Sequence, residues 1–235
     1  KNKAITYYSE NNVSNEYIAG LIQADGSLSV SLVRRGLGKK EDIFLMPQFN
    51  FTQHINSRYM VEIIRSKFKN IGNIYIDKNI CRYKVTKLED INNIIIPFFD
   101  KYHLRGDKLI SYIKFRFVVK YLMYIRLNKN KGITIPELHK IFLSLIIISK
   151  NINPLVKPSN NLRYLKPEDM IIINNNDLLL NMDDELKNEI FLFKLNKLTI
   201  DFICGLFDGD GDISVVLSRD KNNNIILKLT LNIVQ

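Results

Sequence analysis

Two aspartates, Asp25 and Asp210, are the residues of this sequence best placed to do chemistry, because each ends one copy of a repeated segment. Ser14–Gly26 reads SNEYIAGLIQADG, and Thr199–Gly211 reads TIDFICGLFDGDG. Each copy has a helix-capping residue, an acid in the first turn and a terminal glycine, so we expect two short helices. If these helices pack together, the two carboxylates meet at their C-terminal ends, where mutual repulsion and both helix dipoles favour a bound cation.

Mg²⁺ is the cation that suits this arrangement, with Ca²⁺ or Mn²⁺ able to take its place. It accepts one or two carboxylates together with phosphate and water oxygens. The backbone at Ala24 and Gly209 could supply further ligands. Paired metals at a phosphodiester would activate water and stabilise the leaving oxygen. We therefore expect metal-dependent hydrolysis by Asp25 and Asp210.

Small residues on the two helices explain how they could approach closely. Gly20 and Ala24 are four residues apart, as are Gly205 and Gly209 in the second copy. Such spacing lets helix backbones come together, whereas a glycine in mid-helix otherwise costs about 1 kcal/mol relative to alanine. The alternative is that these glycines pack against bulky core side chains.

A second echo shows that the repeat is longer than the helix. Gln48–Gln53 reads QFNFTQ, and Thr230–Gln235 reads TLNIVQ. Hydrophobic periodicity and turn residues predict an α+β fold made of duplicated αββαββα units with antiparallel sheets. In the first unit the later elements are strands at 27–35, 44–53, 73–77 and 81–86, and helices at 57–70, 88–102, 108–127 and 136–149.

Three segments follow from the repeat. Residues 1–150 form the first unit, and residues 151–197, rich in Pro and Asn, form a linker with one or two short helices. Residues 198–235 begin a second unit that stops after two strands. Half a sheet is not a stable end, so we expect a longer chain or a second polypeptide to supply the rest.

The composition indicates a polyanionic partner. The 235 residues carry a net charge of +10 with a pI near 9.4, which favours nucleic acid or an anionic membrane surface. The most apolar run, Ile141–Ile148, is too short to span a bilayer, so no membrane segment is expected. The abundance of Asn, Ile, Lys and Tyr fits AT-rich codons, and we expect an organelle, such as the mitochondrial matrix.

Alternation along the strands predicts a polar sheet face. If Phe49 and Phe51 point into the core, their neighbours point out. Gln and Asn can pair with adenine, and Arg or Lys with guanine, in the major groove of DNA, although an ordinary solvated sheet face would look similar. The candidate DNA-binding residues are Ser29, Ser31, Arg35, Gln48, Asn50, Thr52, Arg82, Lys84 and Thr86, with Lys228, Thr230 and Asn232 in the second copy.

Ile18–Gly26 (IAGLIQADG) and Ile203–Gly211 (ICGLFDGDG) resemble the signature of the LAGLIDADG homing endonucleases. The resemblance implies two saddle-shaped sheets in the DNA major groove, related by a pseudo-two-fold axis and packed through the two motif helices. It also implies site-specific cleavage of both strands of a long, asymmetric target, encoded by an intron or intein. Asp25 and Asp210 match the family's metal-binding acidic residues.

The same resemblance implies further catalytic residues. FNFTQ, ending at Gln53, resembles a segment that supplies a glutamine to the cleft, and Gln235 matches it in the second copy. Phe98–Lys108 resembles a segment with a basic residue, which implies a role for Lys108; a solvated lysine at a helix start is the alternative.

The sequence departs from the family pattern at two places. The sixth motif position, usually acidic, is Asp208 in the second copy but Gln23 in the first, and His103 stands where proline is usual. These departures leave open an intron maturase that binds host intron RNA, and a DNA-binding protein of this fold that has lost catalysis. The two intact aspartates favour the endonuclease.

Overall fold

The computed structural model describes residues 13–35, 42–128, 135–150, 152, 167–174, 177–219, 221 and 225–233. The chain divides into two compact units. The larger unit is Ser27–Asn196, and the motif-helix unit combines the chain up to Gly26 with the chain from Lys197. The motif-helix unit therefore joins the two copies of the repeated helix. The predicted units at 1–150 and 198–235 were defined by the duplicated sequence, whereas these two compact units are defined by contacts. The predicted boundaries therefore stay a prediction.

The larger unit is built on a four-stranded antiparallel sheet, as expected for this α+β fold. Its order is β1-β2-β4-β3, and β4 pairs antiparallel with both β2 and β3. Lys78, with φ of 49°, makes the tight turn between β3 and β4. The strand bounds are β1 Gly26–Arg35, β2 Asp42–His54, β3 Asn73–Asp77 and β4 Ile80–Val85.

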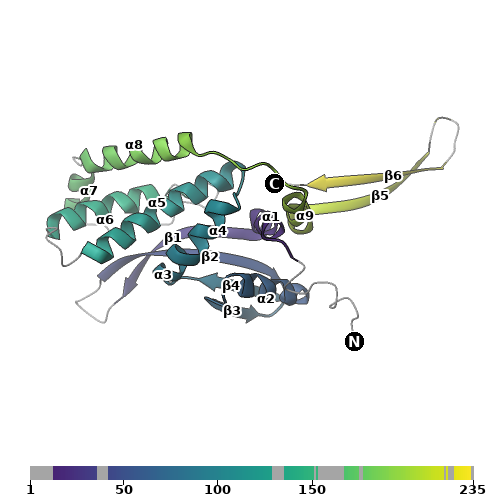
Figure 1. Ribbon diagram of the computed structural model, residues 1–235, viewed down its shortest axis with the longest axis horizontal. Helices are drawn as coiled ribbons and strands as arrows, with labels where there is room; N and C mark the ends of the chain where they lie inside the picture. Colours follow the sequence, from purple (N-terminus) through teal and green to yellow (C-terminus); the bar gives the residue numbers. More distant parts are fainter. Residues whose placement is uncertain are drawn as a thin grey trace. The chain divides into compact units, whose positions relative to one another are not determined.

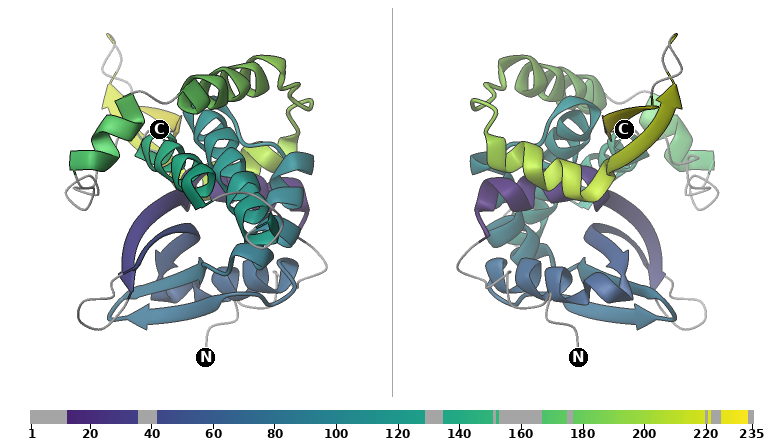
Figure 2. Two further views of the ribbon diagram at one scale, coloured as in Figure 1. Left: turned by 90° about the vertical axis from the view of Figure 1, so that its left-hand side faces the viewer. Right: turned by 90° about the vertical axis from the view of Figure 1, so that its right-hand side faces the viewer.

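The helices of the larger unit lie close to the predicted positions. Figure 2 shows α5 and α6 on one side of the curved strands. The helix expected at 88–102 is built from α3, a π-helical segment and α4 in succession. None of the helices in the described ranges is long and apolar enough to cross a membrane. The bounds are η3 Ile55–Ser57, α2 Arg58–Lys67, α3 Leu88–Asp90, η4 Ile91–Ile95, α4 Ile96–Lys101, α5 Gly106–Asn128, α6 Ile135–Lys150, α7 Pro167–Asn174 and α8 Asp177–Leu192.

An aromatic core holds these helices against the sheet. The ring of Phe49 on β2 meets Phe68 edge-on at 5.5 Å and Tyr83 at 5.9 Å, and Phe99 on α4 meets Tyr112 on α5 at 5.6 Å. All five residues are buried. Edge-to-face pairs of this kind add about 0.5–1.5 kcal/mol each to the burial of apolar area. One face of the sheet is thus fixed under helices, as the alternation of Phe49 with polar residues predicts.

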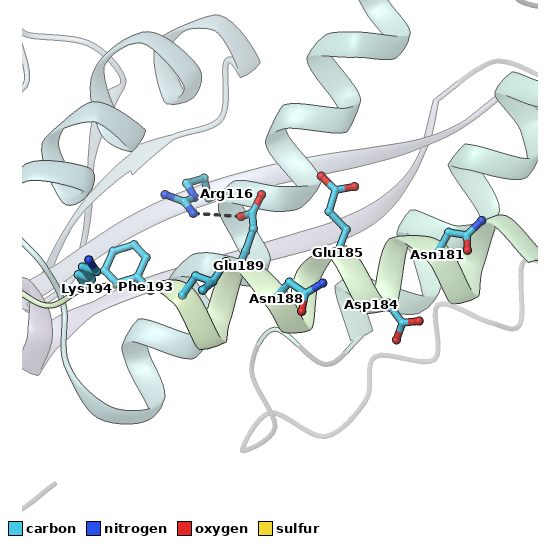
Figure 3. Close-up of a pocket in the computed structure, with 9 residues that line it drawn as sticks. Arg116, Asn181, Asp184, Glu185, Asn188, Glu189, Phe193 and Lys194 are labelled. Atoms are coloured by element: carbon cyan, nitrogen blue, oxygen red, sulfur yellow. Dashed lines mark hydrogen bonds and ion pairs between the residues drawn. The ribbon is translucent and has the colours of Figure 1, made fainter.

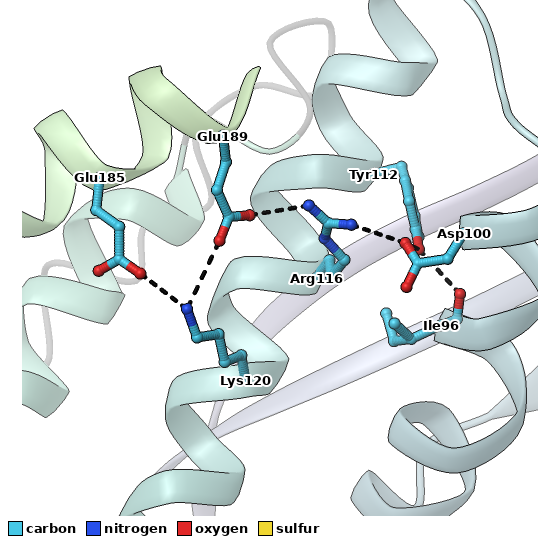
Figure 4. A network of polar contacts seen from close by, with 7 residues as sticks. All are labelled: Ile96, Asp100, Tyr112, Arg116, Lys120, Glu185 and Glu189. Carbon is cyan, nitrogen blue, oxygen red and sulfur yellow. Dashed lines mark hydrogen bonds and ion pairs between the residues drawn. The ribbon is translucent and has the colours of Figure 1, made fainter. Parts of the chain in front are cut away.

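The segment expected to be a linker contains a substantial helix. α8 has 16 residues, longer than the short helices expected, and buries Met182 and Leu186 at helical spacing. Ion pairs tie it to α5: Arg116 Nη2 lies 3.0 Å from Glu189 Oε2, and Lys120 Nζ lies 2.8 Å from Glu185 Oε1 (Figure 4). The Asn and Pro content of this segment hid the apolar periodicity that builds α8.

The same polar network extends into α4. Arg116 Nη1 lies 2.8 Å from Asp100 Oδ1, and the Tyr112 hydroxyl is within hydrogen-bond distance of that oxygen and of the Ile96 carbonyl (Figure 4). Burial raises the pKa of the Tyr112 hydroxyl, and the Asp100 carboxylate raises it further. Tyr112 therefore stays protonated and can donate to Asp100, so α4, α5 and α8 share one network.

The motif-helix unit contains α1 (Asn15–Asp25), α9 (Ile200–Asp210), β5 (Gly211–Arg219) and β6 (Ile225–Ile233). α1 and α9 lie side by side (Figure 1). The predicted N-caps are confirmed: the Ser14 hydroxyl accepts from the Tyr17 N–H at 3.1 Å, and Thr199 accepts from the Phe202 N–H at 3.2 Å. β5 and β6 form an antiparallel hairpin directly after α9.

The two faces of the β5–β6 hairpin differ in chemistry. Ile213 pairs with Leu231 and Val215 with Leu229, which gives one aliphatic face. All four of these side chains are exposed. Leu28 and Phe49, the counterparts of Ile213 and Leu231 in the larger sheet, are buried; Leu28 is 4% exposed, whereas Ile213 is 59% exposed. The aliphatic face of β5–β6 is therefore open in this structure.

Candidate functional site

The two motif helices touch through their backbones at the predicted glycines. A Cβ at Gly20 would lie 2.0 Å from the carbonyl oxygen of Phe202, and one at Gly205 would lie 1.9 Å from that of Tyr17. Real Cβ atoms essentially never come within 3.0 Å of such an atom. The neighbours are main-chain atoms, so close helix contact is the reason for these glycines and packing against a bulky side chain is not.

The contacts are reciprocal along the whole pair. Gly20 and Gly205 are 185 residues apart, as are their partners Tyr17 and Phe202. Further along, a Cβ at Gly209 would lie 2.2 Å from the Cβ of Ala24, its counterpart in the first copy. A pseudo-two-fold axis therefore runs between the helices, as the duplicated sequence predicts.

This axis brings Asp25 and Asp210 to the same end of the helix pair. Each is the last residue of its helix. A Cβ at Gly209 would lie 3.1 Å from Oδ2 of Asp25, so the Asp25 carboxylate lies against the opposite helix. Two carboxylates at the negative ends of two helix dipoles attract a cation. This is the arrangement that the repeated sequence predicts.

The two carboxylates are oxygen donors of the kind that a hard divalent cation prefers. Within the described residues, no group of three or more His, Cys, Asp or Glu side chains could enclose a metal by itself. Two carboxylates leave ligand positions for phosphate and water oxygens, which is how Mg²⁺ is usually held. Asp25 and Asp210 are thus the residues that would hold the metal.

The other expected catalytic residues belong to the larger unit or fall outside the described chain. Gln53 lies opposite Cys81 on β4, half-buried and on the same side of β2 as Phe49. Lys108 is half-buried in the first turn of α5. Gln235 lies outside the described residues. The catalytic roles of Gln53, Lys108 and Gln235 stay predictions.

The outer face of the larger sheet carries the expected polar rows. Asn50 pairs with Lys84, and Thr52 pairs with Arg82, across β2 and β4. Arg82 is exposed and the other three are half-exposed. Because the flanking Phe49 and Phe51 are buried, these four side chains share the face that the helices leave open.

Two further residues extend these rows onto β3. Asn73 lies opposite Lys84, and Tyr75 lies opposite Arg82. Tyr75 is 53% exposed. The sequence interpretation missed both. Their alternation with Ile74 and Ile76, in a hairpin with β4, is the signal that could have found them.

Not every predicted surface residue is exposed to solvent. Gln48 is buried, because its Nε2 donates to the Ser31 hydroxyl at 2.7 Å instead of facing solvent. Thr86 is exposed but lies just beyond the end of β4. Ser29 is half-exposed, and the side chain of Arg35 lies outside the described part of the chain. As DNA contacts, these residues stay predictions.

The second hairpin repeats the polar rows. Thr230 pairs with Ser214, Asn232 with Asp212, and Lys228 with Val216, on the face opposite the aliphatic one. Lys228 and Asn232 are exposed. The register therefore places the three predicted residues of β6 on one polar face.

His103, where the motif resemblance predicts proline, has a structural role. Its Nδ1 accepts the backbone N–H of Asn196 at 3.0 Å, and its Nε2 lies 2.9 Å from the Asp100 carbonyl oxygen. The Asn196 side chain donates to the Lys101 carbonyl at 2.8 Å. His103 therefore fastens the end of the linker to the segment before α5.

A surface hollow of about 760 Å³ lies along α8 (Figure 3). Its lining mixes acidic side chains such as Glu185 and Glu189 with Arg116 and Lys194. Most of these charges already serve the network of Figure 4. The hollow contains neither motif aspartate, so it is not the candidate site.

Comparison with known proteins gives one consistent result. A model of the LAGLIDADG endonuclease family matches residues 18–119. The chain is 28% identical over 205 residues to a probable intron-encoded DNA endonuclease of Mycosarcoma maydis, covering 86% of this chain and 69% of that protein. It is 30% identical over 128 residues to an uncharacterized cox1 intron-2 protein of Schizosaccharomyces pombe, covering 54% of this chain and 35% of that protein.

Solved structures agree on the fold. The structure of the LAGLIDADG homing endonuclease I-GzeII in complex with its DNA target matches with a TM-score of 0.66 at 22% identity. The match covers 94% of this chain and 66% of that chain. The chain spans only part of the length of each of these proteins.

Proposed function

Because this chain belongs to the LAGLIDADG endonuclease family, we propose that it is a site-specific endonuclease that hydrolyses both strands of a long, asymmetric DNA target. The observation that carries the proposal is the position of Asp25 and Asp210 at one end of a reciprocally packed helix pair. A pseudo-two-fold pair of carboxylates suits a duplex, whose two scissile phosphates are themselves related by a local two-fold axis.

In this proposal Asp25 and Asp210 each serve one strand. Each carboxylate would hold Mg²⁺ between the protein and a scissile phosphate, with Mn²⁺ able to replace it. The bound ion would supply an activated water and stabilisation of the leaving oxygen. By the motif resemblance, Gln53 and Lys108 remain candidate catalytic residues: a glutamine amide can orient water, and a lysine can offset negative charge on a phosphate.

The polar rows would read the DNA. Asn50 and Asn73 can pair with adenine, and Arg82 and Lys84 with guanine, in the major groove. The net charge of +10 would add attraction to the phosphate backbone. The relative of known structure is itself bound to a DNA target.

We propose an intron of a mitochondrial gene as the origin of this sequence, and the relatives support it. One is described as intron-encoded and another by its position in cox1 intron 2. Together with an amino-acid composition that fits AT-rich codons, this supports an intron of a mitochondrial gene and action in the mitochondrial matrix.

A further partner is proposed for the β5–β6 hairpin. Leu28 and Phe49 are buried under helices in the larger unit, whereas their counterparts Ile213 and Leu231 are exposed. A helical layer of the same kind, from a longer chain or a second polypeptide, would cover this face.

The test of catalysis is Asp25→Asn, which keeps size and hydrogen bonding but removes a charge. We expect a loss of cleavage of at least about a hundredfold with DNA affinity unchanged or tighter, because a carboxylate without metal repels phosphate. Cleavage would be measured with Mg²⁺, and affinity with Ca²⁺ as a non-catalytic substitute.

The control is Asp183→Asn, the same change at an exposed aspartate of α8 that pairs with Lys187. It should cut at the parent's rate. If Asp25→Asn cuts both strands as fast as the parent, the assignment of the site is wrong. If the parent binds DNA without cutting, the inactive DNA-binding protein is the better conclusion, and preferential binding of intron RNA would indicate the maturase.

A further inference from the structure

One contact between the motif helices breaks their symmetry. The hydroxyl of Tyr17 on α1 donates to Oδ2 of Asp208 on α9, at 2.5 Å. The 185-residue repeat gives Tyr17 the counterpart Phe202 and gives Asp208 the counterpart Gln23. Phe202 has no hydroxyl to donate. At the position related by the pseudo-two-fold axis, the repeat therefore has Phe202 and Gln23 in place of Tyr17 and Asp208.

Burial explains why these two substitutions go together. Gln23 is buried, with 7% of its surface exposed, whereas Asp208 is exposed to solvent. A carboxylate at position 23 would be buried, and burying a charged group costs more free energy than burying a neutral one. A neutral amide avoids that cost. At position 208, water and the Tyr17 hydroxyl both stabilise the ionised group.

We propose that Tyr17 and Asp208 are positioning residues that fix the last turn of α9 against α1 and thereby place Asp210. Asp208 precedes Asp210 by two residues in that turn, and its carboxylate is committed to Tyr17. The repeat places Gln23 and Phe202, which carry no charge, at the corresponding positions of the helix pair. In this proposal the residue at the sixth motif position holds one helix against the other and does not bind metal. Whether that residue is acidic or neutral depends on whether the aromatic residue of the other helix has a hydroxyl group.

The consequence for cleavage rests on the proposed function. Since only Asp210 is placed by this pair, the two strands should respond separately to substitution. Loss of the Tyr17–Asp208 bond should disturb Asp210 and leave Asp25 in place. The strand that depends on Asp210 is identified beforehand as the one that Asp210→Asn leaves uncut.

The experiment compares Tyr17→Phe, Asp208→Gln and the double variant with the parent. The double variant has at positions 17 and 208 the residue types that the repeat has at Phe202 and Gln23. In single-turnover cleavage at saturating DNA and Mg²⁺, each single variant should slow the Asp210-dependent strand about tenfold. The other strand and the DNA affinity should stay within about twofold of the parent. The double variant should recover most of the lost rate.

A matched control is Tyr121→Phe. Tyr121 on α5 donates to Glu185 on α8 at 2.5 Å, the same kind of bond at the same distance. Its loss should lower the melting temperature without favouring either strand. If Tyr17→Phe also slows both strands equally, or if the double variant is no better than the singles, the positioning role is wrong. A metal-ligand role would instead appear as a higher Mg²⁺ requirement for Asp208→Gln alone.

A folding measurement separates this inference from the proposed function. In urea, the unfolding equilibrium constants of the four proteins form a double-mutant cycle. A hydrogen bond to a charged group predicts a coupling of about tenfold. That coupling is expected whether or not the protein cuts DNA. If it is absent, the positioning role of Tyr17 and Asp208 is wrong even if the protein cleaves DNA.

Discussion

At the scale of single residues, Gly20 and Gly205 are the most constrained positions of the helix pair. Each meets a main-chain carbonyl group of the opposite helix rather than a side chain. A side chain can rotate away from an added methyl group, but a carbonyl inside a helix cannot. The aspartates at the ends of α1 and α9 therefore depend on two residues that have no functional group.

Gly20→Ala should separate the two helices. The added methyl would lie 2.0 Å from the Phe202 carbonyl oxygen, and overpacking of this kind costs about 1–3 kcal/mol of unfolding free energy. Urea denaturation measures the loss. Cys204→Ala, at an exposed position of α9, should change stability by less than about 0.5 kcal/mol. Equal stability of Gly20→Ala and the parent would contradict close backbone contact.

At the scale of elements, α8 shows how a charged network can make a connecting segment part of a core. Burial alone would raise the pKa of the Glu185 carboxyl group, but hydrogen bonds from Lys120 and Tyr121 outweigh it, so this pKa lies below its ordinary value of 4.5. A carboxyl group whose pKa is lowered on folding stabilises the fold above its unfolded pKa and stops doing so as the pH falls through the folded value.

Glu185→Gln should therefore destabilise the protein at pH 7 and make little difference near pH 3. Glu185 is more than a third exposed, so solvent limits the effect at pH 7 to less than about 1 kcal/mol. Thermal unfolding of both proteins at several pH values gives the comparison. Glu168→Gln, at an exposed site on α7, serves as control. A difference that grows below pH 4.5 would have the opposite sign and refute the role of this ion pair.

The β5–β6 hairpin has an aliphatic face whose exposure can be measured. Apolar patches of this kind promote association, so the isolated chain should bind an apolar fluorescent dye and self-associate as concentration rises. Val215→Thr should reduce both effects. Val216→Thr makes the same change one residue along, on the polar face opposite Lys228, and should do less. Similar results for both variants would show that the aliphatic face is not the cause.

At the scale of the whole molecule, the excess of positive charge should govern DNA affinity. A protein that neutralises six to ten phosphates loses about 10³- to 10⁵-fold in affinity between roughly 50 and 200 mM salt. Filter-binding titrations with specific and unrelated duplexes would show this dependence for both. Arg82→Ala should weaken discrimination at individual base pairs by about 1–3 kcal/mol with little change in the salt slope. A flat salt dependence would contradict a DNA-binding role.

Much of this molecule could be predicted from residue order because its local patterns and its fold agree. The caps at Ser14 and Thr199 and the burial of Phe49 and Phe51 were confirmed, and Asn50, Thr52, Arg82 and Lys84 share one face of the sheet as expected. Gln48 was expected outside but is buried, since alternation gives a direction and not the neighbour, here Ser31, that covers a side chain.

Outside the repeated helices, the sequence could not show which residues are partners across long separations. The 16-residue α8 depends on Arg116 and Lys120, more than sixty residues earlier. The role of His103 depends on Asn196, which lies 93 residues later. Asn73 and Tyr75 gain meaning only from their pairing with β4. Each of these is set by tertiary contact, which no local spacing encodes.

The contact of carbonyl groups with glycine has a consequence for how such proteins diversify. A backbone carbonyl group is the same whichever side chain its residue carries. The contact between α1 and α9 therefore depends little on the sequence of the repeat unit that supplies each helix. Recombination between related genes could exchange one whole half, with its own base preferences, and still leave a junction that fits. Tyr17 and Asp208 lie on opposite sides of that junction, so theirs is the match that such an exchange would break and that selection would then have to restore.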